Sequence, residues 1–128
     1  MGLAKDSPFF PVEASRVILE GPNCLAFFDR YPVSQGHALV VPFRPVLSLY
    51  ELDEHMQAEI WDTVRRVREI LDERFDPAGF NIGVNDGRAA GQTLPHAHVH
   101  VIPRYAGDVP DPRGGIRWVI PEKARYWA

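Results

Sequence analysis

The chain contains little cysteine, no excess of basic residues and no long apolar run. One cysteine, Cys24, stands among 128 residues, so an internal disulfide framework is excluded. A lone thiol is typical of a reducing compartment, and we expect a cytoplasmic protein. Fourteen basic residues against 17 acidic ones give a net charge of −3. Because nucleic acids attract strongly basic proteins, we expect no nucleic-acid partner.

Membrane segments are also missing from the sequence. No apolar run approaches the roughly 20 residues of a membrane-spanning helix, and the first residues lack the charged-then-apolar order of a signal peptide. Hydrophobic residues make up 45% of the chain and charged residues 24%, which is ordinary for a globular protein. We therefore expect no membrane partner and a single domain over residues 1–128, with its core at about 15–105 and a C-terminal tail at 106–128.

Five short segments have the composition of β-strands. Each is rich in branched or aromatic residues and is bounded by proline, glycine or asparagine. The segments are 16–20, 24–29, 37–41, 80–85 and 96–103. Cys24 lies at the start of one of them, followed by apolar neighbours, so we interpret it as a core residue and not as a nucleophile.

The segment between the third and fourth strands has the periodicity of a helix. Apolar residues recur there at steps of three and four: Met56, Ile60, Val64, Val67, Leu71 and Phe75. Asp53 is a suitable N-cap, and Asp76-Pro77 ends the pattern. The sequence therefore predicts an α+β fold, in which one long helix packs on the apolar face of an antiparallel sheet of about five strands.

Three histidines alternate along the last predicted strand, at positions 96, 98 and 100. Alternate residues of a strand share a face, so all three imidazoles point to the same side. One such histidine is ordinary, but three together are costly to bury without a purpose. The pattern indicates a functional site.

A metal site is one interpretation of these histidines. At about 3.3 Å per residue, His96 and His100 lie roughly 13 Å apart along the strand, too far to share one ion easily. A metal would use two of the three with a ligand from elsewhere, for which His37 is the evident candidate. This interpretation stays open at the level of residue spacing.

Phosphoryl chemistry is the other interpretation. An imidazole is a nucleophile near neutral pH when one ring nitrogen is free and the other is hydrogen-bonded, and neighbouring imidazoles donate protons to phosphate oxygens. The loop before the strand carries Gly91, Gln92 and Thr93, which offer backbone N–H groups, an amide and a hydroxyl. Uncharged donors of this kind suit a phosphate in transfer.

Other polar residues fall at the ends of the predicted strands. Asn85 either reaches the same phosphate or only opens the turn that follows it. Phe27 and Asp29 share a strand face, where they suit the base and the ribose of a nucleoside, although the sequence alone explains Phe27 better as a core residue. His37 opens its strand and is placed to add an imidazole near the other three.

The run His96-Ala97-His98-Val99-His100-Val101-Ile102 resembles the signature of the histidine triad family. Further segments agree with the family in order and spacing: 24–29, 36–42, 85–87 and 91–93. The resemblance covers roughly residues 17–105. The continuation Pro103-Arg104 with Gly107-Asp108 is similar to fragile-histidine-triad-like hydrolases, and the tail is similar to small bacterial members.

This resemblance implies a homodimer whose sheets join into one, and a nucleotide bound with its α-phosphate over the histidines. It implies that His98 attacks that phosphate and forms a covalent nucleotidyl-histidine, while His100 contacts phosphate oxygens. By the same likeness His96 orients the site and His37 lies beside it, with no metal or other cofactor required. The remaining implied ligands are Asp29 for ribose, and Asn85, Gln92 and Thr93 for the phosphates and leaving group.

The expected activity is hydrolysis or transfer at the α-phosphate of an adenine nucleotide derivative, with a dinucleoside polyphosphate as the leading substrate. Three alternatives remain at this stage. They are an adenosine phosphoramidase, a nucleotide-binding module with little turnover, and a metal-binding protein.

Overall fold

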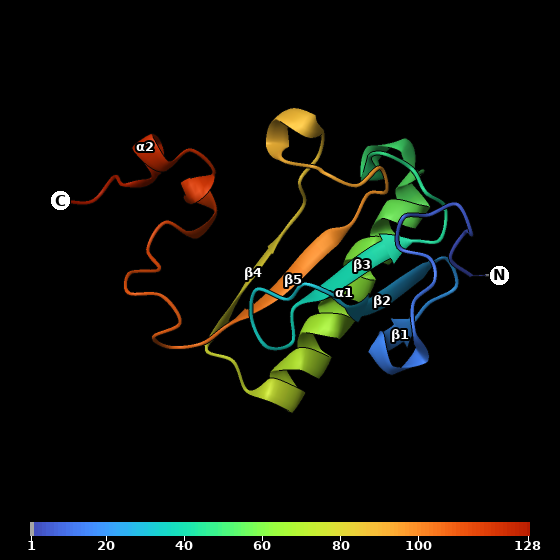
Figure 1. Cartoon of the computed structure of the whole chain (residues 1–128), viewed down its shortest axis with the longest axis horizontal. Helices are drawn as coiled ribbons and strands as arrows, with labels where there is room; N and C mark the ends of the chain where they lie inside the picture. Colours follow the sequence, from blue (N-terminus) through green and yellow to red (C-terminus); the bar gives the residue numbers. More distant parts are fainter. Residues whose placement is uncertain (1) are drawn as a thin grey trace.

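The computed structural model describes residues 2–128 and contains one five-stranded antiparallel sheet. Its strands are β1 (Val17–Glu20), β2 (Cys24–Phe28), β3 (Ala38–Pro42), β4 (Gly79–Gly83) and β5 (Val99–Arg104). They lie in the order β1-β2-β3-β5-β4, so β5 is flanked by β3 on one side and β4 on the other (Figure 1). The predicted α+β class and the five-stranded antiparallel sheet are confirmed.

The long helix α1 (Glu54–Phe75) crosses one face of the sheet (Figure 1). Asp53 caps it as predicted, because its side chain accepts a hydrogen bond from the Met56 N–H at 2.8 Å. Its apolar stripe is buried against small and branched residues of β2, β3 and β5. No helix within residues 2–128 has the length and apolar character needed to cross a membrane.

The opposite face of the sheet is covered by the N-terminal segment. Leu25, Phe27, Leu39 and Val41 form a second buried cluster on this face. Partly buried N-terminal residues pack on the cluster, and they include Leu3, Phe9 and Val12. No motif or periodicity in the sequence of this N-terminal segment indicates that it covers the sheet.

The predicted histidine strand is shorter than expected. β5 begins at Val99, so His96 and His98 precede it in a bend and an unpaired stretch. The cause is a local change of partners, because the His96 N–H bonds to the Leu94 carbonyl and the Ala97 N–H bonds to the Val46 carbonyl. The chain therefore leaves the sheet before it reaches the loop, although the histidine rings remain neighbours.

The tail lies beyond β4, at the left of Figure 1. It contains a short 3-10 helix (Gly115–Val119) and a single turn, α2 (Pro121–Ala124). Arg104 fixes its start by a bidentate contact with Asp108, at 2.7 and 2.8 Å. Several apolar residues of the tail are exposed: Ile116, Trp118, Val119, Ile120 and Tyr126.

Gly36 lies in the turn before β3 and packs against Phe75 at the end of α1, so it provides a test of this packing. Its φ is +88°, and a Cβ there would lie 2.8 Å from the Phe75 ring. We expect Gly36→Ala to lower the free energy of unfolding by about 1–3 kcal/mol, measured by urea denaturation. Gly79→Ala is the control, since it meets no atom within 4 Å. Equal effects of the two changes would contradict the packing described.

Candidate functional site

His98 has one ring nitrogen fixed by the backbone. Its Nδ1 lies 2.8 Å from the carbonyl oxygen of His96. A carbonyl oxygen only accepts, so Nδ1 carries the proton and Nε2 keeps its lone pair. The side chain is buried to 9% exposure, and its ring stands 5.0 Å from that of His100. His98 therefore presents an unprotonated nitrogen beside a second imidazole.

His96 uses both of its ring nitrogens inside the protein. Nε2 donates to the carbonyl of Pro42 at 2.8 Å, and Nδ1 accepts from the hydroxyl of Ser7 at 2.7 Å. The residue is fully buried. With no nitrogen left for a ligand, His96 positions the neighbouring carbonyl that holds His98.

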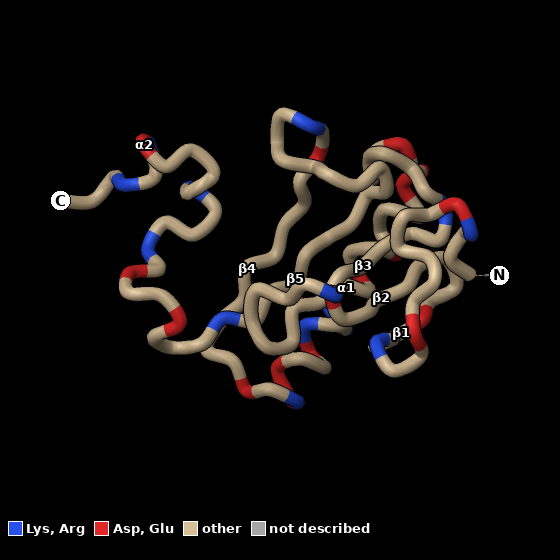
Figure 2. Tube along the Cα trace, in the orientation of Figure 1, with Lys and Arg blue, Asp and Glu red and all other residues tan. Residues whose placement is uncertain are grey.

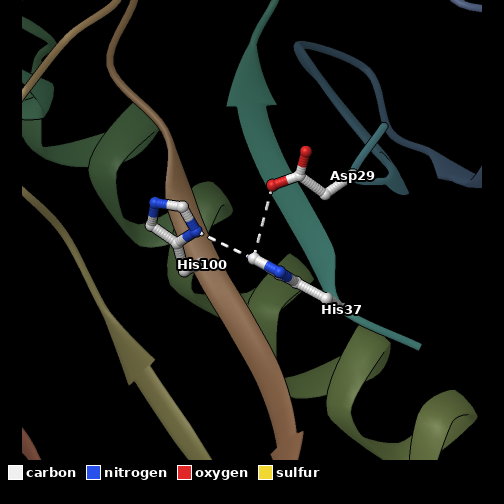
Figure 3. A group of neighbouring side chains, drawn as sticks. All are labelled: Asp29, His37 and His100. Carbon is white, nitrogen blue, oxygen red and sulfur yellow. Dashed lines mark hydrogen bonds and ion pairs between the residues drawn. The ribbon is translucent and has the colours of Figure 1, made fainter. Parts of the chain in front are cut away.

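His37, His100 and Asp29 form a connected group (Figure 3). The backbone N–H of Val33 donates to His37 Nδ1 at 3.1 Å, so His37 carries its proton on Nε2. That nitrogen lies 2.9 Å from His100 Nδ1 and 3.5 Å from Asp29 Oδ2. His100 thus accepts on Nδ1, and its Nε2–H is free for a substrate.

The same three residues are the one group within residues 2–128 whose ligand atoms lie close enough for a metal, all within 4.8 Å. A metal was expected to use two of the three alternating histidines together with His37, and the structure places His100 within hydrogen-bond distance of His37. A metal needs the lone pair of His37 Nε2. Because Nδ1 already accepts from Val33, Nε2 must hold the proton, and the hydrogen bonding favours a chain of fixed protons over a metal site.

Phe27 lies in the core. It has no exposed surface, and its ring packs edge-on against Phe9 at 5.6 Å. Phe9 also lies 5.4 Å from the ring of His96 and 5.3 Å from that of His98. In this arrangement Phe9 covers Phe27, so a bound base would meet Phe9 before it met Phe27.

The loop before His96 is closed on itself by Gln92. The Gln92 amide accepts from the Gly87 N–H at 2.9 Å and donates to the carbonyls of Leu47 and Leu94. These contacts use its amide, so Gln92 shapes the loop instead of offering a free donor. The Gly91 N–H is bound to the Arg88 carbonyl, and its φ of +98° closes the turn.

Two further predicted residues stay accessible. Thr93 is exposed, and its hydroxyl makes no hydrogen bond within residues 2–128. Asn85 is exposed two residues beyond β4, where Gly83 pairs with His100. Continuing this antiparallel register brings Asn85 level with His98.

Comparison with known proteins places this arrangement in a family. The family model described as the HIT domain matches residues 11–107. The chain belongs to the HIT family. A bis(5'-nucleosyl)-tetraphosphatase [asymmetrical] of Schizosaccharomyces pombe is 39% identical over 99 residues, which cover 77% of this chain and 54% of that protein. An AP-4-A phosphorylase of Mycobacterium tuberculosis is 37% identical, over 75% of this chain and 50% of that one.

Solved structures agree with this HIT assignment. A HIT family protein from Bacillus anthracis has a TM-score of 0.69 at 34% identity, with 73% of this chain and 66% of that chain covered. A zinc-bound histidine triad family protein from Mycobacterium smegmatis has a TM-score of 0.67 at 32% identity, covering 84% and 83%. The chain spans about half the length of the first two curated relatives named above.

Two residues that contact the histidines, Ser7 and Phe9, were not found by the sequence analysis. Ser7 is 89 positions from His96, and its segment carries neither periodicity nor a motif. The only local pattern that could have pointed to this segment is the pair Ser7-Pro8, which indicates an ordinary turn. Only the three-dimensional contact identifies their role.

Burial makes the three supporting imidazoles hard to protonate. Burial is the main cause that lowers the pKa of His37 and of His96, and it lowers the pKa of His100 to about 4. The neighbouring His98 adds to the lowering in each case. These rings are therefore neutral at pH 7, as the hydrogen-bond roles above require.

These lowered pKa values make stability depend on pH. Between the ordinary histidine pKa of 6.5 and about 4, the unfolded chain binds a proton at His100 that the folded protein does not. Stability from this residue is thus complete above pH 6.5 and is lost as the pH falls towards 4. We expect urea unfolding to show a shallower decline over this range for His100→Asn. An unchanged slope would contradict the lowered pKa.

Ser7 provides a second test, because Ser7→Ala leaves His96 Nδ1 without its donor. We expect the free energy of unfolding to fall by about 1–3 kcal/mol, since a buried acceptor loses its only partner. Thermal or urea denaturation measures the change. Ser15→Ala, at an exposed serine, is the matched control and is expected to change stability by less than about 0.5 kcal/mol. A loss at Ser7 no larger than this would refute the contact.

Proposed function

We propose that this HIT protein is a nucleotidyl hydrolase that acts at the α-phosphate of an adenine nucleotide derivative, with a dinucleoside polyphosphate as substrate. The observation that carries the proposal is His98 with Nδ1 bound to a carbonyl and Nε2 unprotonated, beside the free Nε2–H of His100. Relatives named as a tetraphosphatase and an AP-4-A phosphorylase support the substrate class.

In the first step the lone pair of His98 Nε2 forms a bond to the α-phosphorus. The bond from phosphorus to the leaving oxygen breaks, and the leaving phosphate keeps the electron pair. Attack makes the imidazole positive, and the His96 carbonyl that accepts its Nδ1–H stabilises this charge. The His100 Nε2–H donates to a non-bridging phosphate oxygen.

In the second step water attacks the phosphorus of the nucleotidyl-histidine. The nitrogen–phosphorus bond breaks, its electron pair returns to His98 Nε2, and the proton of the water passes to solvent. The products are the nucleoside monophosphate and the free enzyme. The chain Val33–His37–His100 keeps the same proton positions throughout, because the backbone N–H of Val33 fixes the first of them.

The nucleoside would be held on the β2 side of the triad. The Asp29 carboxylate, partly exposed beside His37, accepts from ribose hydroxyls, and Phe9 supplies the aromatic surface that covers Phe27. Asn85 and Thr93 supply donors to the phosphates from the other side. The reaction as proposed needs no metal, and full activity in the presence of a chelator is the expected result.

We further propose a homodimer joined at the β4 edge. The outer edge of β4, on the side away from β5, pairs with no strand within residues 2–128, and the exposed apolar residues of the tail lie beside it. Figure 2 shows Lys and Arg interleaved with Asp and Glu along the chain, which suits a nucleotide better than a nucleic acid. A free, buried Cys24 suits a cytoplasmic location.

Replacement of the nucleophile tests the central claim. We expect His98→Ala to lower hydrolysis of diadenosine tetraphosphate by about a thousandfold or more, because no covalent intermediate forms. Alkaline quenching, which preserves the acid-labile nitrogen–phosphorus bond, followed by mass spectrometry should detect a nucleotidyl adduct in the wild type and none in the variant. His55→Ala, at an exposed histidine of α1, is the control and is expected to retain activity. Turnover by His98→Ala at the wild-type rate would disprove the mechanism.

A further inference from the structure

A groove of about 710 Å³ lies beside the loop that precedes His96. Its lining includes Arg88 with three exposed residues that follow in the chain, Thr93, Leu94 and Pro95. The loop rises above the sheet between β4 and β5, as the gold turn at the top of Figure 1. None of the steps proposed above uses Arg88.

The groove and Asp29 lie at opposite ends of the triad. The backbone N–H of Asp29 donates to the carbonyl of His37. His37 comes one residue before Ala38, which faces Val101 of β5. From that level the chain of β5, followed backwards, passes His100 and then His98 before it enters the loop. A nucleotide with its ribose at Asp29 and its α-phosphate at His98 therefore directs its leaving group towards the groove.

The turn that carries Arg88 is held rigidly. Arg88–Ala90 form one 3-10 turn between Gly87 and Gly91, both with φ near +98°. The Gln92 amide ties Gly87 to the carbonyls of Leu47 and Leu94. A turn fixed at both ends presents its side chain at a defined place, which reduces the entropy that binding must overcome.

The chemistry of the groove combines one cation with apolar surface. The Arg88 guanidinium makes no ion pair or hydrogen bond to any residue in the 2–128 range, whereas Arg104 and Arg113 are each paired with an aspartate. Leu47 and Leu94, 59% and 37% exposed, lie on the same groove. A guanidinium binds phosphate oxygens in a bidentate manner, and leucine side chains pack against a base.

We infer that Arg88 determines specificity for the leaving group. It binds the phosphates beyond the α-phosphate, and the leucines beside it contact the second nucleoside. The inference rests on the proposed function and names the residues that recognise the polyphosphate leaving group of its substrate. Compounds that carry a small leaving group on the same adenylate, such as a phosphoramidate, would not use the groove.

Binding in the His98→Ala background tests this without turnover. Calorimetry would measure the Kd of diadenosine tetraphosphate and of AMP with and without Arg88→Ala. We expect Arg88→Ala to weaken the tetraphosphate about tenfold, as for one guanidinium–phosphate contact, and AMP by less than about twofold. Arg88→Lys should recover part of the loss, because a point charge replaces the fork. Arg66→Ala, an equal charge change on an exposed part of α1, should alter neither Kd.

The outcomes separate the two proposals. Equal weakening of both ligands, or no weakening of the tetraphosphate, would overturn the role of Arg88. The absence of a nucleotidyl adduct in the wild type would instead overturn the proposed function. In that case a selective loss of tetraphosphate binding in Arg88→Ala would still support the role of Arg88 in binding the polyphosphate.

Discussion

Three of the four imidazoles of the site are each oriented by a hydrogen bond to the backbone, and the fourth, His100, is oriented by the ring of His37. The His96 carbonyl holds His98, the Pro42 carbonyl holds His96, and the Val33 N–H holds His37. A backbone group is either a donor or an acceptor and does not titrate, so each contact fixes one tautomer. The position of every proton in the site follows from these contacts, including the free lone pair of His98.

The two-sided burial of the sheet is what makes those contacts possible. On one face α1 buries the small residues between the histidines. On the other face the N-terminal segment places Ser7 against His96 and Phe9 against His98. Water is thereby excluded from the supporting rings, which lowers the pKa of His37, His96 and His100 and keeps them neutral.

The two ends of the site, taken along β5, carry different groups. Asp29 lies at one end of the histidines and the groove with Arg88 lies at the other. The two ends differ in chemistry, because a carboxylate suits sugar hydroxyls and a guanidinium suits phosphates. A substrate with a nucleoside at each end of a phosphate chain would contact both ends, and His98, the proposed nucleophile, lies between them.

The sequence by itself determined the local and periodic features. The spacing of apolar residues predicted α1, Asp53 predicted its cap, and strand alternation put three imidazoles on one face, because these patterns depend on neighbours within a few positions. The family signature was equally local. The boundary at Val99 was missed, since the partners that end the strand come from Val46, far along the chain.

Only the tertiary structure decided which groups meet. The bond from Ser7 to His96 joins residues 89 positions apart, and the pair of His37 with His100 joins residues 63 apart. Only the structure shows that the Gln92 amide closes its own loop and that Phe27 is buried beneath Phe9. Such contacts arise from the packing of distant segments, and no pattern in the residues around either partner encodes them.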